Sequence, residues 1–195
     1  MAVTRDRFAQ GLTYQQFKDQ MTRNQERFAQ NERALQLDPA DLAAFKNLPA
    51  PLNVLVLAED WCGDVVDNLP ILGRLADESG KLEVRIFLRD QNADLMDQYL
   101  KDGQYRSIPV FAFFDQDFRE LGRFIERPES VTKRMAQVRA ALYAEHPEYG
   151  SPETPISQLP EEARVALQAA ISAQREQNRA ANNADVVREV RAIVG

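Results

Sequence analysis

Apolar positions in the first fifty residues recur at helical spacing. The stripe that we expect on a buried helix face consists of Tyr14, Phe17, Met21, Phe28 and Leu35. Gaps of three, four or seven residues are typical of a helix, and core packing explains such a stripe better than a ligand role does. Thr13 precedes the stripe as a candidate N-cap, and Pro39 interrupts the pattern after it. A second, short helix is expected over about 41–47, before Pro49 and Pro51.

The middle of the chain alternates between continuous apolar runs and helical patterns. Runs of this length are typical of strands buried on both faces. The expected strands are 52–58, 82–88, 110–114 and 119–125. The last two are joined by a short polar turn and predict an antiparallel hairpin. Helices are expected over about 63–78, after the turn at 90–92, and over about 129–145. This order predicts an α/β fold, with a mixed central sheet flanked by helices, and not a Rossmann array.

The last part of the chain has a different character. Residues 150–160 hold three prolines and are typical of a linker, and helices near 160–180 and 183–194 follow. The pattern leaves open whether these helices pack on the core or contact a partner, such as a second copy of the chain. We expect three segments: an N-terminal helical extension at 1–50, a central domain at 51–147, and a linker with a C-terminal helical extension packing on the core at 148–195.

Composition and charge indicate an ordinary globular protein and argue against several other classes. The chain has 195 residues, of which 44% are hydrophobic and 28% charged, as in ordinary globular proteins. Its net charge of −6 is concentrated in residues 51–130, which hold nine basic and sixteen acidic side chains, so nucleic acid is not an expected partner. The apolar runs are too short to span a membrane, and the charged start is unlike a signal peptide. One cysteine allows neither an internal disulfide nor a cysteine metal cage, so we expect no metal, no resident cofactor and a cytoplasmic location.

Cys62 is the candidate for chemistry. It lies in the polar segment 59–64, directly after the first expected strand and at the start of a helix. Free N–H groups and the helix dipole stabilise a thiolate at such a position. Three nearby carboxylates, Glu59, Asp60 and Asp64, oppose ionisation by a comparable amount. The sequence therefore offers two interpretations, a reactive thiol and a buried, inert cysteine.

The segments around Cys62 resemble those of the thioredoxin superfamily over about residues 52–145. The matching segments, in chain order, are Trp61-Cys62-Gly63, Pro70-Ile-Leu72, Gly80-Lys-Leu82, Asp90-Gln-Asn92 and Arg106-Ser-Ile-Pro109. The string Glu-Asp-Trp-Cys-Gly-Asp, with helices before and after, is similar to a bacterial group of thioredoxin family proteins. The resemblance implies a thioredoxin-like fold for the central domain, with extra N- and C-terminal helices.

The resemblance also implies roles for residues near the thiol. It implies that the bond between Ile108 and Pro109 is cis and faces Cys62. The backbone of Ile108 then binds an extended, thiol-bearing substrate in the manner of a strand. Trp61 forms an apolar rim, with Gly63 and Asp64 beside the thiol.

Three departures from the family pattern bear on function. The second cysteine of the family motif falls on Val65, so dithiol exchange within the chain is impossible. The family's buried acid and its lysine partner fall on Val56 and Ile86. Asp64 takes the place of the motif's proline, where it either complements the helix dipole or takes part in chemistry.

These observations favour a monothiol thiol–disulfide oxidoreductase that uses Cys62 and an external small thiol as the resolving partner. Its partner would be a thiol- or disulfide-bearing protein or small thiol. A redox-inactive module that binds peptides or proteins, and a cysteine redox sensor, are the alternatives. We interpret Arg89 as a surface ion pair rather than a ligand for a carboxylate. We interpret the single histidine, His146, as a solvated helix C-cap.

Overall fold

The computed structural model describes residues 3–195 and is a mixed α/β structure, as the sequence predicts. Its strands are β1 (Leu52–Ala58), β2 (Leu82–Leu88), β3 (Val110–Phe114) and β4 (Glu120–Ile125). The α-helices are α1 (Arg5–Ala9), α2 (Tyr14–Gln20), α3 (Gln25–Ala34), α4 (Pro39–Lys46), α5 (Gly63–Ser79), α6 (Ala93–Met96), α7 (Glu129–Glu145), α8 (Glu161–Gln177) and α9 (Arg179–Val194). Short 3-10 turns are η1 (Arg89–Gln91), η2 (Pro147–Tyr149) and η3 (Ile156–Gln158).

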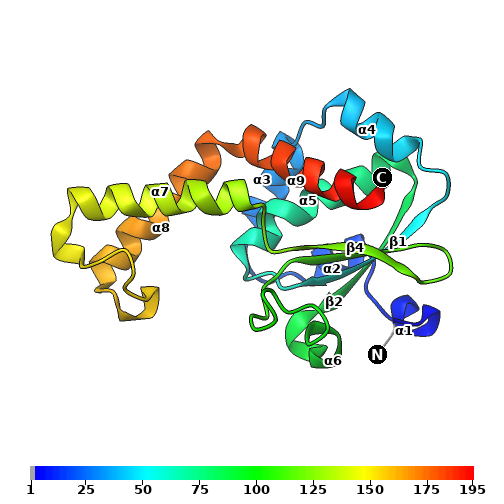
Figure 1. Ribbon diagram of the computed structural model, residues 1–195, viewed down its shortest axis with the longest axis horizontal. Coiled ribbons are helices and arrows are strands. Elements are labelled where there is room, and N and C mark those ends of the chain that lie inside the picture. Colours follow the sequence, from blue (N-terminus) through cyan, green and yellow to red (C-terminus); the bar gives the residue numbers. More distant parts are fainter. Residues whose placement is uncertain (1–2) are drawn as a thin grey trace. The chain divides into compact units, whose positions relative to one another are not determined.

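The sheet has the strand order β2-β1-β3-β4. β1 and β2 are parallel, because α5 carries the chain from the end of one to the start of the other. β3 runs antiparallel to β1 and forms the predicted hairpin with β4. In Figure 1, α5 and the final turns of α9 lie on one side of the sheet, and α1 and α6 lie on the other.

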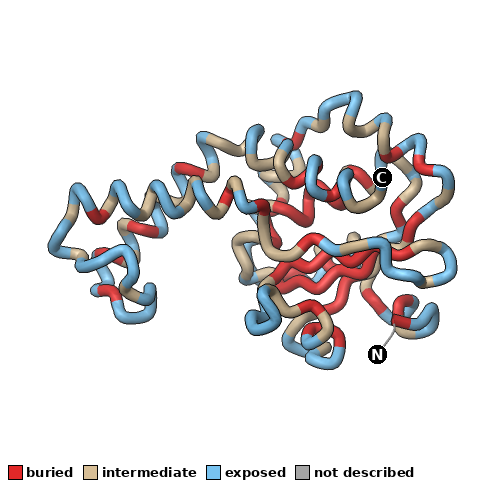
Figure 2. Tube along the Cα trace, in the orientation of Figure 1, coloured by how far each residue is buried: buried red, intermediate tan, exposed pale blue. Residues whose placement is uncertain are grey.

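The core follows from the apolar runs. Val54, Leu55, Val56 and Leu57 of β1 have no exposed surface, because β1 is an inner strand with side chains covered on both faces. Figure 2 shows the same burial along the strands of the sheet. The N-terminal stripe packs onto this core with Phe17, Met21, Phe28 and Leu35 buried, so the structural interpretation of that stripe is confirmed.

The structure divides the N-terminal helical pattern that the sequence left continuous. α2 begins after Thr13, which forms the expected N-cap in a capping box with Gln16. α2 ends before Met21, and α3 begins only after Asn24, which has a left-handed φ of 55°. Asn is one of the few residues that adopt this conformation readily. The spacing of apolar residues alone does not predict this interruption of the helix.

The chain forms two compact units. One contains the described residues up to Arg127 together with Val186–Gly195, and the other contains Pro128–Asp185. In the first unit, Val186, Val187 and Val190 of α9 join the main core. In the second, Tyr143 of α7 packs with Leu159, Ala163 and Leu167. The three-segment division at 50/51 and 147/148 stays a prediction. No helix within residues 3–195 has the length and apolarity that a membrane crossing requires.

Candidate functional site

Three segments that are distant in sequence meet at one edge of the sheet. β1 and β2 are parallel, so the turn after Ala58 and η1 after Leu88 leave the sheet at the same edge. β3 is antiparallel to β1, so the loop that enters β3 at Val110 starts from that edge too. This topology brings the Cys62 turn next to the loop of Pro109.

Cys62 is the N-cap residue of α5 and is half-buried. Its backbone N–H donates to the Glu59 carbonyl at 3.2 Å, and its carbonyl accepts from the Val66 N–H at 3.1 Å. The Sγ atom lies 3.4 Å from the Ile108 carbonyl oxygen, to which it donates a hydrogen bond. The thiol is thus at the mouth of a helix and within contact of the segment that the resemblance assigns to substrate binding.

The Ile108–Pro109 peptide bond is cis, and both residues are buried. The Pro109 carbonyl accepts from the Glu126 N–H at 2.7 Å, and the Glu126 carbonyl accepts from the Asn68 side chain at 2.9 Å. Glu126 has a φ of 68°, which a non-glycine residue rarely adopts. The Glu126 backbone therefore links Pro109 to Asn68 of α5 by two hydrogen bonds.

Each carboxylate near Cys62 has its own partner. Glu59 is buried and accepts from the Asp90 N–H at 2.8 Å; burial raises the pKa of its carboxyl. Burial also acts to raise the pKa of Asp60, but hydrogen bonds from the Thr22 and Arg23 N–H groups outweigh it and lower the pKa overall. Asp64 forms an ion pair with Arg127. The carboxylates therefore oppose a thiolate less than three free charges would.

The ion pair of Asp64 belongs to a chain of charges. Arg127 also contacts Glu126 at 2.6 Å, and Glu126 contacts Lys101 at 2.5 Å. The side chains of Asp64, Arg127 and Glu126 are 13–19% exposed, so this network is largely removed from solvent. It contains two acids and two bases and fixes the first turn of α5 to the segment after β4. The sequence alone could not reveal Arg127, because it lies 63 residues from Asp64 without any motif around it.

Trp61 directly precedes Cys62 in the chain, and its side chain is 40% exposed. The Arg89 guanidinium stacks over its ring, 4.7 Å from the centroid. Arg89 also pairs with Asp90 at 2.7 Å, as the surface ion pair that the sequence suggested. Its contact with Trp61 was not predicted.

The structure thus brings Trp61, Cys62, Gly63 and Asp64 together with Ile108 and Pro109.

His146 lies in the second compact unit, as the C-cap residue of α7. Its ring stacks on Tyr149, and its Nδ1 lies 2.9 Å from Glu148. Within residues 3–195, no group of three or more His, Cys, Asp or Glu side chains is placed to hold a metal ion.

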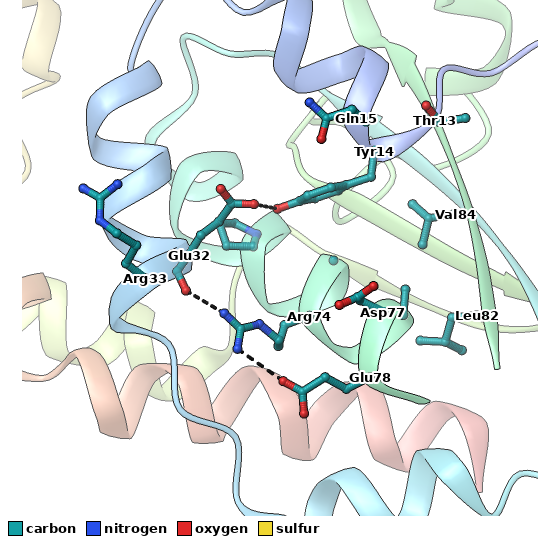
Figure 3. A pocket seen from close by; sticks show the side chains of 13 residues that line it. Thr13, Tyr14, Gln15, Glu32, Arg33, Arg74, Asp77, Glu78, Leu82 and Val84 are labelled. Carbon is teal, nitrogen blue, oxygen red and sulfur yellow. Dashed lines mark hydrogen bonds and ion pairs between the residues drawn. The ribbon is translucent and has the colours of Figure 1, made fainter. Parts of the chain in front are cut away.

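A separate cavity of about 690 Å³ lies between α2, α3, α5 and β2 (Figure 3). Pro70, one of its lining residues, is eight residues after Cys62, or about 12 Å along the helix. The Tyr14 hydroxyl donates to Glu32 at 2.8 Å, and burial raises the pKa of Tyr14. Arg74 donates to the Glu32 carbonyl at 3.0 Å. These polar groups bind one another, and none of the residues that line the cavity is one of the site residues around Cys62.

A mixed sheet of this order, with a helix-start cysteine facing a cis-proline loop, defines a protein of the thioredoxin-like fold. A family model described as thioredoxin matches residues 11–140, two thirds of the chain, and the chain belongs to that family.

Two solved structures are similar. One is a protein of unknown function from Pseudomonas aeruginosa, with 25% identity and a TM-score of 0.63, covering 89% of this chain and 99% of the other. The other is an HIV epitope-scaffold, with 19% identity and a TM-score of 0.62, covering 96% of this chain and 94% of the other; it shows the fold alone. No curated protein matches the sequence.

Proposed function

We propose that this protein is a monothiol thiol–disulfide oxidoreductase, a single-cysteine bacterial member of its family, with Cys62 as the reacting residue. The observation that carries the proposal is the position of the Cys62 Sγ, 3.4 Å from the Ile108 carbonyl at the cis-proline loop and at the first turn of α5. An extended substrate that pairs with the Ile108 backbone would bring its sulfur to the same place.

The reaction is a pair of exchanges at sulfur. Cys62 first loses its proton to solvent water and gives up the hydrogen bond to Ile108. The Cys62 thiolate then attacks one sulfur of a disulfide, a new S–S bond forms to Cys62, and the other sulfur leaves as a thiolate. A second, external thiolate then attacks the substrate sulfur of the mixed disulfide; a new S–S bond forms between these two sulfurs, the bond to Cys62 breaks, and Cys62 leaves as a thiolate. The external thiol is a co-substrate, because Val65 occupies the place of a resolving cysteine.

The charges around the thiol support this chemistry. Asp64 is neutralised by Arg127, and the charge of Asp60 is stabilised by two backbone N–H groups, while the N–H groups of the first turn of α5 favour an anion. Both acids would otherwise raise the energy of the thiolate.

Incubation with oxidised glutathione, followed by mass spectrometry, tests the proposal. We expect one glutathione adduct at Cys62, formed about tenfold faster than exchange with free cysteine and removed by reduced glutathione. Cys62→Ser should form none. Adduct formation only after unfolding by urea would contradict the proposal.

A redox-inactive peptide-binding module is the second candidate, since two aromatic side chains in the segments of the site are exposed. Trp61, next to Cys62, is 40% exposed, and Tyr105, three residues before Ile108, is 60% exposed. In that case Cys62→Ser binds extended peptides as the wild type does, and native Cys62 reacts slowly. A sensor would instead accumulate sulfenic acid at Cys62 with peroxide, without exchange with oxidised glutathione.

A further inference from the structure

Arg89 contacts all three segments that form the site. Its guanidinium stacks on Trp61 of the turn after β1, at 4.7 Å from the ring centroid. Its Nη1 donates to the Arg106 carbonyl at 3.2 Å, in the loop that leads to the cis proline. Its Nε and Nη2 donate to Asp90 of η1, at 2.9 and 2.7 Å.

The contacts use the planar, cationic face of the guanidinium as well as its several N–H donors. The Arg89 guanidinium lies over the indole, and its N–H groups donate to the Arg106 carbonyl of another segment and to Asp90 of its own segment, η1. The Arg89 side chain is only 23% exposed although it lies at the surface. A lysine ammonium has no flat face and fewer directed donors, so it could not make all three contacts at once.

Arg106 is two residues before Ile108, and Trp61 directly precedes Cys62. The Arg89 contacts therefore hold the aromatic rim at a fixed place relative to the backbone that an extended substrate would meet. The Asp90 N–H is in turn held by the buried Glu59 carboxylate at 2.8 Å, which anchors η1 to the same turn.

We propose that Arg89 is a positioning residue that clamps Trp61 to the Arg106 loop and so determines how extended, peptide-like disulfides dock at Cys62. This inference rests on the proposed exchange chemistry at Cys62. Arg89 does not touch the sulfur; it acts through Trp61 and through the loop. A small reagent that needs no docking surface should depend on it much less than a peptide does.

The first measurement uses Trp61, the only tryptophan of the chain, as a reporter that is independent of chemistry. We expect Arg89→Ala to increase the quenching of Trp61 fluorescence by acrylamide about twofold, because the guanidinium covers one face of the ring. Arg89→Lys should lie close to Arg89→Ala. Arg123→Ala is the matched control, since it removes an ion-paired guanidinium stacked on Tyr99 and should leave Trp61 unchanged.

The second measurement compares two reactions of Cys62. One is alkylation by iodoacetamide; the other is exchange with a short unstructured peptide whose cysteine carries a 2-thiopyridyl group, which releases pyridine-2-thione. In Arg89→Ala we expect the ratio of the peptide rate to the iodoacetamide rate to fall about five- to tenfold. The peptide concentration that gives half of the maximal rate should rise.

The two measurements separate the outcomes. Unchanged quenching of Trp61 in Arg89→Ala overturns the clamp, whether or not Cys62 reacts. Increased quenching with an unchanged rate ratio overturns the docking role. A wild-type Cys62 that reacts with neither reagent overturns the proposed function, and the quenching result then still decides the clamp.

Discussion

At the scale of single residues, the site depends on how each acid near the thiol is satisfied. Asp60, Glu59 and Asp64 lie within six residues of sequence but meet three different environments: backbone N–H groups from the segment before α3, a buried position beside η1, and an ion pair with Arg127. The sequence shows that three acidic side chains lie near Cys62. It does not show how strongly each one opposes a thiolate, because their partners come from distant segments.

Asp60→Asn should lower the free energy of unfolding at pH 7 by about 1–2 kcal/mol, since the charge-assisted hydrogen bonds from Thr22 and Arg23 become weaker. The pKa of Asp60 is lowered in the folded protein, so its carboxylate contributes stability above the unfolded pKa and loses it as the pH falls through the folded pKa. The difference from wild type should therefore shrink below about pH 4. Urea unfolding across pH measures it. Asp77→Asn, at an exposed position of α5, is the control, and an equal loss at every pH would contradict the assignment.

The sequence placed Cys62 and Pro109 in the site because both belong to short motifs with a fixed order along the chain. It did not place Arg127 or the contact between Arg89 and Trp61. The ion pair of Arg127 depends on where β4 ends, and the contact of Arg89 depends on the path of η1. A local sequence motif predicts neither of these. Motifs thus identified the reacting groups, while their charge environment required the folded chain.

At the scale of elements, the buried strands were predicted to the residue for 52–58, 82–88 and 110–114, because runs of apolar residues between polar turns leave few alternatives. The ends of the helices differ more from the predicted ranges. The helix expected after the turn at 90–92 is short, because α6 already ends at Met96 and turns follow. Tertiary contacts, rather than local spacing, decide where such short helices end.

Thr13→Ala should destabilise the protein by about 1 kcal/mol, because it removes the oxygen that accepts from the Gln16 N–H at the start of α2. Thr13→Ser keeps this acceptor and should remain close to wild type. Chemical denaturation of the two variants checks the prediction. If Ser costs as much as Ala, the lost methyl group rather than the cap is responsible.

At the scale of the whole molecule, residues distant in sequence complete the first compact unit. α9 contributes Val186, Val187 and Val190 to a core built otherwise from residues before Arg127. Gly122 of β4 also lies against Ile193, so closely that an added Cβ would come within 2.9 Å of that side chain. The end of the chain therefore covers part of this core, including Gly122 of β4.

Val190→Ala should lower the free energy of unfolding by about 1–3 kcal/mol, because Val190 is 1% exposed and its loss leaves a cavity. Val165→Ala is the matched control, since Val165 is 55% exposed and the same atoms are removed. Thermal unfolding, monitored by circular dichroism, compares the two. Equal effects would show that α9 contributes nothing to the core.

The return of the chain in α9 has a consequence for biosynthesis. A ribosome makes the strands and Cys62 well before it makes Val186–Val194, so the part of the core that contacts Val186, Val187 and Val190 stays uncovered while Pro128–Asp185 is translated. During that interval we expect the unfinished unit to aggregate more readily than the completed one, because apolar side chains of its core are open to solvent.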